Sequence, residues 1–450
     1  MTPDELLAIG DRVVAGARRG EGVEVVVTWS RDTEIRAYEG AVEQFTSATS
    51  AGVGIRVVAD QRQGFAYAGT LDPAAVDQAF EDARDNAAFS SVDQYAGLAQ
   101  PDGVAAVDLA LHDERLAATS TDDRIAMAIA FEELVRTGDP RIVGIDGGAD
   151  YSDTDALSAI VSTNGIRTAA AETGCALSVY SIAEADGDVS TGFGFSVGRH
   201  PGELDMERAA ADAVQRAVRM LGARPAASER LTVILDPWVT AQFLSIVAEA
   251  FSADSVLKGR SLFAGRQGEL VASELVTLVD DPTDRLAWGA SPTDGEGIAT
   301  RRTNLIDAGV ASGFLYDSYT ARAMGGATTG SAVRHGFMST PSAGAQAVSL
   351  VSGEVSRDEL LATVGDAVLV QEVAGMHSGV NPVSGDFSTG IEGLRLRGGE
   401  AAEPIREVTI ASTLLRMLGD VVAVGSDLEY FPFDAAGVSL AIADVTLSGA

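Results

Sequence analysis

Apolar and polar residues alternate with a period of two through residues 20–70, as they do in strands that bury one face. The alternating segments are Val23–Thr28, Thr33–Tyr38, Val42–Thr46, Val53–Val58 and Gly64–Ala68. Polar turn candidates, Arg31-Asp32 and Asp60-Gln61-Arg62, separate some of them. This part of the chain is therefore predicted to form a series of short strands.

Helical periodicity follows, and then a second strand-rich region. Apolar residues recur at helical spacing in Asp72–Asn86, Thr121–Thr137 and Asp205–Leu221. Residues 141–197 return to strand patterns, with hairpin signals at Asn164-Gly165 and Asp186-Gly187. The first twenty residues form an amphipathic pattern with acids early and arginines late, which predicts a helix and not a signal peptide.

The segment Arg224–Ser228 (RPAAS) has the composition of a linker. A buried strand over residues 231–235, a helix over Trp238–Phe251 and many short strand patterns come after it. We therefore predict an α+β fold: a mixed α/β N-terminal region with antiparallel sheets, followed by a β-rich C-terminal domain. The predicted domains are residues 1–224 and 230–450, a division expected for a chain of this length.

Composition narrows the functional classes. The chain has 32 basic residues against 65 acidic ones, a formal net charge of −33, and Lys258 is its one lysine. Phosphate recognition needs a basic surface, so nucleic-acid binding is not expected. No apolar run approaches the roughly 18 residues that span a bilayer, and one cysteine fits a reducing compartment, so a cytoplasmic protein without membrane contact is expected. An acidic surface that steers basic peptides is a weaker hypothesis.

The stretch Gly375–Gly390 (GMHSGVNPVSGDFSTG) is the most informative one in the chain. Its glycines and proline exclude a regular helix and interrupt any strand. It joins two predicted strands, in Ala367–Val370 and Ile391–Leu396. A long glycine-rich connection of this kind brings backbone close to a ligand or partner, although a purely structural bend would have the same composition.

Within this stretch, VNPVSGDFS (Val380–Ser388) resembles the C-terminal signature of the TldD/PmbA family, the "modulator of DNA gyrase" proteins of bacteria and archaea. Other blocks follow the family's order: Val276–Asp281 (VTLVDD), Asp294–Gly297 (DGEG), Leu305–Gly313 (LIDAGVASG), Ser318–Gly330 (SYTARAMGGATTG) and Val424–Leu428 (VGSDL). The resemblance therefore extends over roughly 200 residues and is carried by several ordered motifs.

The resemblance also draws attention to a motif that is missing. Family members of the TldD type hold zinc with a His-Glu-x-x-x-His helix and a cysteine near the C-terminus, a donor set suited to peptide hydrolysis. An ungapped register anchored on Lys258-Gly259 places Leu244, Ser245 and Glu249 at the three motif positions. No histidine lies between residues 200 and 335, and the one cysteine is Cys175. The chain thus resembles the PmbA branch, also called TldE, which pairs with a zinc-bearing TldD subunit.

Motifs for other chemistries are weak. The one lysine is flanked by Leu257 and Gly259, which excludes a Walker loop. Gly192–Gly198 alternates like a strand and has the wrong spacing for a dinucleotide loop. The four histidines are scattered, so no metal ligand and no catalytic residue is expected in this chain. Any zinc is expected in the partner subunit.

Candidate substrate-binding residues are Arg334, His377, Asn381, Gly385 and Asp386. In the family the region around Arg334-His335 lies near the substrate cleft, where an arginine could pair with a peptide carboxylate. His377 and Asp386 could form a base-and-orienter pair, although a histidine satisfied by its loop is the favoured interpretation. Asp386 is also expected to cap the loop by accepting backbone N–H groups.

Two acidic pairs allow alternative interpretations as well. Asp294 and Glu296 are either turn residues or acids of a cleft, and Asp280-Asp281 reads as a turn after a strand.

The sequence therefore predicts a TldE/PmbA-like subunit that completes a peptide-binding groove for proteolysis by a zinc-bearing partner. The expected substrate is an unfolded or modified peptide. One alternative is a metal-independent homodimer that binds peptides or proteins without hydrolysing them. Another is a hydrolase with a metal site outside the family pattern, built from His377, His335 and acids.

Overall fold

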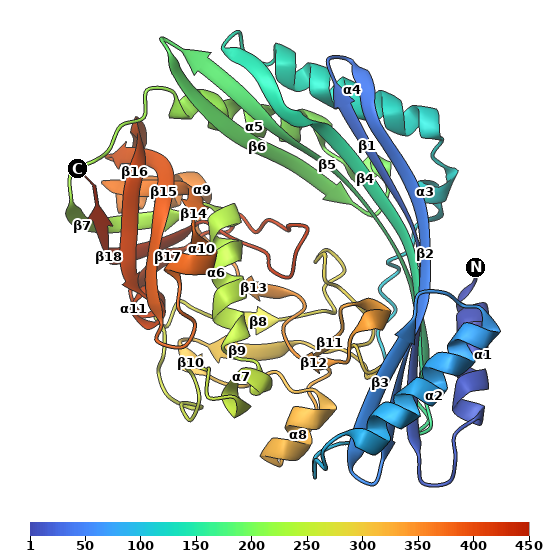
Figure 1. The fold of residues 1–450 in the computed structure, drawn as a ribbon. Helices are drawn as coiled ribbons and strands as arrows, with labels where there is room; N and C mark the ends of the chain where they lie inside the picture. Colours follow the sequence, from blue (N-terminus) through green and yellow to red (C-terminus); the bar gives the residue numbers. More distant parts are fainter. Residues whose placement is uncertain (450) are drawn as a thin grey trace.

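A computed structural model describes residues 1–449, and its first feature is a long, curved antiparallel sheet (Figure 1). The strand order is β3-β2-β1-β4-β5-β6. The strands are β1 (Gly22–Tyr38), β2 (Ala41–Ala59), β3 (Arg62–Ala68), β4 (Ile142–Ser162), β5 (Arg167–Ala185) and β6 (Asp188–Gly198). The predicted hairpin turn at Asp186-Gly187 is confirmed: both residues have positive φ, which a tight two-residue turn requires.

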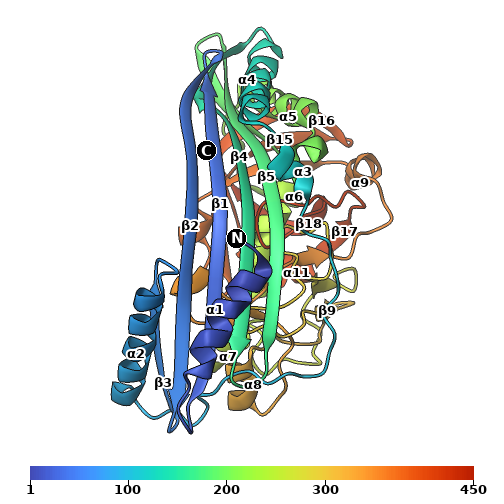
Figure 2. The same cartoon turned by 90° about the vertical axis from the view of Figure 1, so that its right-hand side faces the viewer.

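Helices cover the outer face of this sheet (Figures 1 and 2). They are α1 (Pro3–Ala15), α2 (Pro73–Phe89), α3 (Glu114–Ala118), α4 (Thr121–Thr137) and α5 (Met206–Met220). Two apolar clusters lie beneath them, one under α1 and α2 and one under α4 and α5. Glycines on β6 allow α5 to approach closely, since a Cβ at Gly194 would lie 2.0 Å from the Ala209 carbonyl oxygen. The opposite, concave face is free for the rest of the chain.

The turn predicted at Arg31-Asp32 is wrong. β1 runs without a break through these residues, and β2 likewise joins two of the predicted short strands. The reason is tertiary pairing: Arg31 and Asp32 are paired with β2 on one side and with β4 on the other. A ladder on both edges satisfies the backbone of a locally polar segment, so the strand continues.

The C-terminal part centres on a second six-stranded sheet of order β16-β15-β14-β7-β18-β17. An additional pairing between β16 and β18 closes the sheet on itself. Its strands are β7 (Glu229–Leu235), β14 (Ala367–Ala374), β15 (Asp386–Arg397), β16 (Glu400–Thr413), β17 (Val421–Val424) and β18 (Leu440–Ser448). The predicted fold class, α+β with a β-rich C-terminal region, is confirmed.

Short elements link this sheet to the concave face of the first one. The strands are β8 (Leu278–Asp280), β9 (Thr303–Asp307), β10 (Val310–Ala311), β11 (Ala332–Val333), β12 (Ser342–Ala343) and β13 (Val348–Leu350). The helices are α6 (Pro237–Glu249), α7 (Ala253–Leu257), α8 (Ser318–Met324), α9 (Arg357–Val364), α10 (Met376–Gly379) and α11 (Leu414–Gly419), with 3₁₀ turns η1 (Pro201–Glu203) and η2 (Gly336–Met338). No helix in residues 1–449 is long and apolar enough to cross a membrane.

The long sheet curves over the C-terminal part (Figure 1), and the contacts that join the two parts include two buried clusters. One is an aromatic cluster in which Phe193 and Phe195 of β6 meet Trp238 of α6 with ring centroids 5.3 and 5.5 Å apart. The other is a buried group of ion pairs, made of Glu24 and Arg56 in the first sheet, Glu296 in the loop before α8 and Arg334 just before η2. The chain passes from one sheet to the other after α5, and domains of residues 1–224 and 230–450 stay a prediction.

Candidate functional site

Helix α6 carries apolar residues on two faces with different surroundings: one face is buried in the core, and the other is only partly covered. Asp236 caps its start by accepting the Trp238 N–H, and Pro237 occupies the first turn, where a missing N–H costs nothing. Phe243, Leu244 and Val247 are buried in the C-terminal core. The opposite face repeats at helical spacing and is only partly covered; it carries Trp238, Gln242, Ser245, Ile246 and Glu249.

The glycine-rich segment stands opposite this face of α6. The strands predicted on either side of it are confirmed as β14 and β15, which pair antiparallel. Between them the chain forms the single turn α10, preceded by Gly375, whose φ is +77°. Gly379 must lack a side chain, because a Cβ there would lie 2.0 Å from the Ser388 carbonyl oxygen of β15.

Helix and loop together enclose a groove of about 500 Å³, which we call the α6 groove. The loop contributes Met376, Val380 and Pro382, and Phe433 closes one side. Its walls are mainly apolar, with the Ser245 hydroxyl, the Gln242 amide and the Glu249 carboxylate as polar groups. A largely apolar cavity with a few polar groups is the usual form of a ligand site.

Hydrogen bonds hold the loop's shape, and they correct one prediction. The Asn381 side-chain oxygen accepts the N–H groups of Val383 (2.9 Å) and Ser384 (3.1 Å). Asp386 had been expected to accept backbone N–H groups; instead, its carboxylate accepts the Ser384 hydroxyl at 2.6 Å. Asn381 takes the capping role because it begins the turn, where an Asx side chain reaches the N–H groups two and three residues ahead.

Gly385 also serves the loop's shape. Its φ is +81°, a region that other residues enter at a cost, and its N–H donates to the Asn381 carbonyl at 2.8 Å. The structure thus brings the main chain of Asn381 and Gly385 together beside the α6 groove. Their contact with substrate stays a prediction.

Arg334 lies elsewhere, in the buried group of ion pairs. Its guanidinium donates to the Glu24 carboxylate and, at 2.9 Å each, to the carbonyls of Gly295 and Ser339. Its side chain is 5% exposed. These oxygen atoms occupy the guanidinium N–H groups that would otherwise bind a peptide carboxylate. The surroundings of Arg334 therefore do not favour the predicted pairing with substrate.

Glu296 belongs to this group and Asp294 adjoins it, and both interpretations apply to Asp294, which caps a turn and also lines a cavity of about 220 Å³ with Arg334. Asp294 is a turn residue whose carboxylate accepts the N–H groups of Glu296, Ile298 and Ala332. Burial raises the pKa of Asp294 to about 7, and the Glu296 carboxylate adds to the rise. Glu296 is fully buried and accepts from Arg56 at 3.3 Å, so it joins the two parts of the fold.

The histidines are distributed over different elements. His335 is exposed and precedes η2, while His377 belongs to α10. The side chain of His377 lies outside the described part of the structure, so its pairing with Asp386 and its contact with substrate stay predictions. Among the described side chains, no group of three or more His, Cys, Asp or Glu residues has the arrangement of a metal site.

The three positions that correspond to the zinc motif can be tested against the chemistry of zinc. Leu244 is apolar and fully buried in the core. The Ser245 hydroxyl donates to Asp434 at 2.8 Å, and only Glu249 offers a carboxylate. Cys175 is buried in the first sheet, where burial raises the pKa of its thiol to about 12. Zinc prefers imidazole and thiolate ligands, so these residues do not fit the metal.

Sequence reasoning missed most of the α6 groove. Helical spacing of partly polar residues along Trp238–Glu249 was the available signal, but it does not tell which face remains uncovered. Phe433 could not be found in this way, because it reaches the groove from a loop far along the chain. Phe433 belongs to the loop that continues from the Val424–Leu428 motif. Phe431 of the same loop contacts both Phe195 and Trp238 and so fixes the position of the loop.

Three sequence models of one family match consecutive parts of the chain. The PmbA/TldA metallopeptidase domain 1 matches residues 23–87, the central domain matches residues 114–221, and the C-terminal domain matches residues 228–449. The family models thus divide the N-terminal region into two parts.

Relatives and solved structures agree with this match. The metalloprotease PmbA of Escherichia coli O157:H7 is 27% identical over 94% of this chain and 91% of its own length. A metalloprotease of Methanothermobacter thermautotrophicus is 28% identical over 94% and 90%. The crystal structure of a proposed modulator of a DNA gyrase from Thermotoga maritima superimposes with a TM-score of 0.89 and 25% identity, covering 98% of this chain and 99% of that one. TldE from Thermococcus kodakarensis shares the fold, with a TM-score of 0.89, 24% identity and 99% coverage of both chains. The chain therefore belongs to the PmbA/TldD metallopeptidase family.

Proposed function

We propose that this chain is a TldE/PmbA-like subunit that positions a peptide for cleavage by a zinc-bearing TldD-like partner. One observation carries the proposal: the face of α6 where Ser245 and Glu249 stand at two of the three zinc-motif positions lines an apolar groove of about 500 Å³. Leu244 is buried in the core and the Ser245 hydroxyl donates to Asp434, which favours a binding role for the helix over zinc chemistry.

The α6 groove suits an extended, unfolded peptide or a modified one. Trp238, Ile246, Met376 and Val380 offer apolar surface from two elements, and such contacts are worth roughly 25 cal/mol for each Å² removed from water. Gln242 and Ser245 provide polar groups at the same wall. Unfolded chains expose the apolar side chains that folded proteins bury, so the groove selects them.

A homodimer that binds peptides without hydrolysing them is the second candidate. The same apolar groove favours it, because binding there requires no metal and no partner. Addition of a zinc-bearing subunit separates the two candidates, since only the first predicts cleavage. The third possibility, a metal site built from His335, His377 and acids, gains no support from the described side chains.

Binding at the α6 groove can be tested with Ile246→Gln in the full-length chain. The substitution replaces an apolar wall residue by a polar one of similar length, and we expect about a fivefold to tenfold loss of affinity, corresponding to roughly 1–1.4 kcal/mol. The probe is a fluorescein-labelled unstructured heptapeptide with alternating apolar residues, measured by fluorescence anisotropy.

Val422→Gln is the matched control, because Val422 is half exposed on β17 and does not line the groove. Its peptide affinity should equal that of the parent chain. Thermal unfolding establishes that both variants fold. Equal affinities for the parent and a folded Ile246→Gln variant would contradict binding in the α6 groove.

A further inference from the structure

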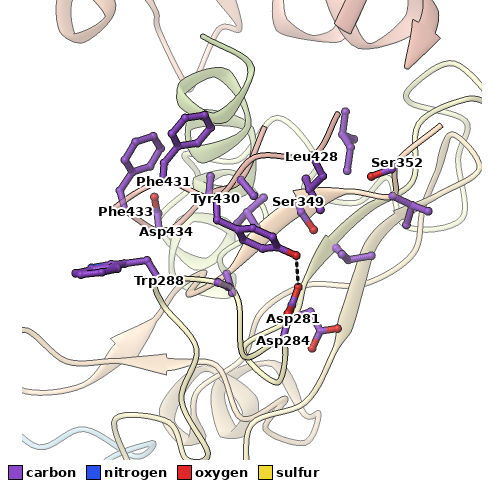
Figure 3. Close-up of a pocket in the computed structure, with 18 of the residues that line it drawn as sticks. Asp281, Asp284, Trp288, Ser349, Ser352, Leu428, Tyr430, Phe431, Phe433 and Asp434 are labelled. Carbon is purple, nitrogen blue, oxygen red and sulfur yellow. Dashed lines mark hydrogen bonds between the residues drawn. The ribbon is translucent and has the colours of Figure 1, made fainter. Parts of the chain in front are cut away.

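A second, smaller cavity, drawn in Figure 3, shares one lining residue with the α6 groove. Its volume is about 160 Å³, below the roughly 300–1,000 Å³ of pockets for drug-sized ligands, so it has room for little more than one side chain. Phe433 lines both cavities, and Ser245 of the groove donates to Asp434 of the smaller cavity. A peptide that extends from the groove past Phe433 would bring one of its side chains to this cavity.

The walls of this cavity combine carboxylates with aromatic rings. Asp281, Asp284 and Asp434 supply three carboxylates, and Arg302 is the one basic residue among the lining residues. Arg302 forms a long ion pair with Asp281, its Nη1 atom lying 3.9 Å from the carboxylate. Trp288 and Tyr430 add aromatic surface (Figure 3). Three carboxylates against one guanidinium leave an excess of negative charge among the lining residues.

Tyr430 keeps one of these carboxylates in place. Its hydroxyl donates to Asp284 at 2.6 Å. Burial and the Asp284 carboxylate both raise the pKa of the Tyr430 hydroxyl, so Tyr430 stays a neutral donor. The other carboxylates are tied to local donors: Asp281 caps the turn at Thr283, and Asp434 accepts from Ser245.

Asp280, the last residue of β8 and the neighbour of Asp281, is affected by the same negative charges. It is fully buried, and its Oδ1 atom accepts the N–H groups of Gln346 and Ala347 while Oδ2 has no partner among the described residues. Burial raises the pKa of Asp280 to about 6, and the charges of Asp281 and Asp434 contribute.

We infer that this cavity receives a lysine or arginine side chain of the peptide held in the α6 groove. An ammonium or guanidinium group would face three carboxylates, and its aliphatic stem would lie against Trp288 and Tyr430. A cation enclosed by carboxylates and aromatic faces is a favourable arrangement, and an acidic side chain is rejected there. The inference rests on the proposed peptide-binding function and adds its sequence preference.

The test compares three labelled peptides that differ only at the central residue, which is lysine, norleucine or glutamate. Norleucine keeps an aliphatic stem like that of lysine and lacks the charge. We expect the lysine peptide to bind the full-length chain about tenfold more tightly than the norleucine peptide, and the glutamate peptide to bind weakest. Raising the salt concentration should reduce the preference.

The variant Asp284→Asn with Asp434→Asn removes two of the charges and keeps the shapes. It should lose the preference for lysine and keep the affinity for norleucine. Glu354→Gln, an exposed acid outside the cavity, should change neither. Equal binding of the lysine and norleucine peptides, or a preference that survives in the double variant, would overturn the inference while leaving the groove intact. Absence of binding by all three peptides would instead contradict the proposed function, and this inference with it.

Discussion

Replacement of Arg56 by methionine is expected to lower the free energy of unfolding by about 3–5 kcal/mol at pH 8. Arg56 is 4% exposed and donates to both Glu24 oxygens, at 3.2 and 2.6 Å. It also donates to Glu296 at 3.3 Å, across the junction of the two parts of the fold. Without it, two buried carboxylates would face each other, with only Arg334 left to pair with Glu24.

The loss of unfolding free energy caused by Arg56→Met should be smaller at acidic pH. Although burial opposes it, Arg56 and Arg334 hold the pKa of Glu24 below its ordinary value in the parent chain. Burial already raises the pKa of Glu296 in the parent chain. In the variant, the loss of Arg56 raises it further and lifts the pKa of Glu24 above its unfolded value, so protonation at pH 5 relieves part of the cost. Urea unfolding at pH 5 and pH 8 measures the difference.

The exposed pair of Arg266 and Glu269 supplies the control. Arg266→Met should change stability by less than about 1 kcal/mol, because exposed ion pairs contribute little. Similar losses for Arg56→Met and Arg266→Met would show that the buried group of ion pairs does not hold the two parts together.

Gly379→Ala is expected to reduce peptide affinity more than tenfold, because the loop wall of the α6 groove would move. A Cβ at Gly379 would lie 2.0 Å from the Ser388 carbonyl oxygen, a backbone atom that cannot rotate away. Either α10 or β15 must shift, which displaces Met376 and Val380. The first sheet is distant from this contact and should stay folded, which far-ultraviolet circular dichroism and limited proteolysis can establish.

Gly326→Ala is the matched substitution, since a Cβ at Gly326 meets no atom within 4 Å. It should leave peptide affinity unchanged. If Gly379→Ala binds peptide as well as Gly326→Ala does, then the close approach of loop and strand does not shape the groove.

Sequence patterns predicted the elements best where local and tertiary preferences agree. The helix predicted at Thr121–Thr137 has those bounds in α4, and Gly192–Gly198 lies within β6. The predicted break at Arg31-Asp32 failed because partners on both sides, far away in the sequence, satisfied that backbone. Local polarity signals a turn only where no such partner exists.

The site was predictable only in part, for a similar reason. The composition of the glycine-rich segment predicted backbone conformations that favour glycine, and Gly375 and Gly385 do have positive φ. The choice between Asn381 and Asp386 as the capping residue depended on the register of the turn, which composition does not give. The burial of Arg334 depended on Glu24, 310 residues away in the sequence. The walls formed by Phe433 and Asp434 likewise come from a loop that only the tertiary fold brings to α6.

The central claim is that this chain positions peptides and a zinc-bearing subunit cleaves them. The most direct measurement is cleavage of an unstructured peptide by the purified chain, by a His-Glu-x-x-x-His subunit from the same cell, and by the two mixed, each with its zinc content determined by elemental analysis. The account predicts cleavage by the mixture that a chelator abolishes, and no stoichiometric zinc in this chain. Robust, chelator-sensitive cleavage by this chain alone, with near one zinc per chain, would contradict it.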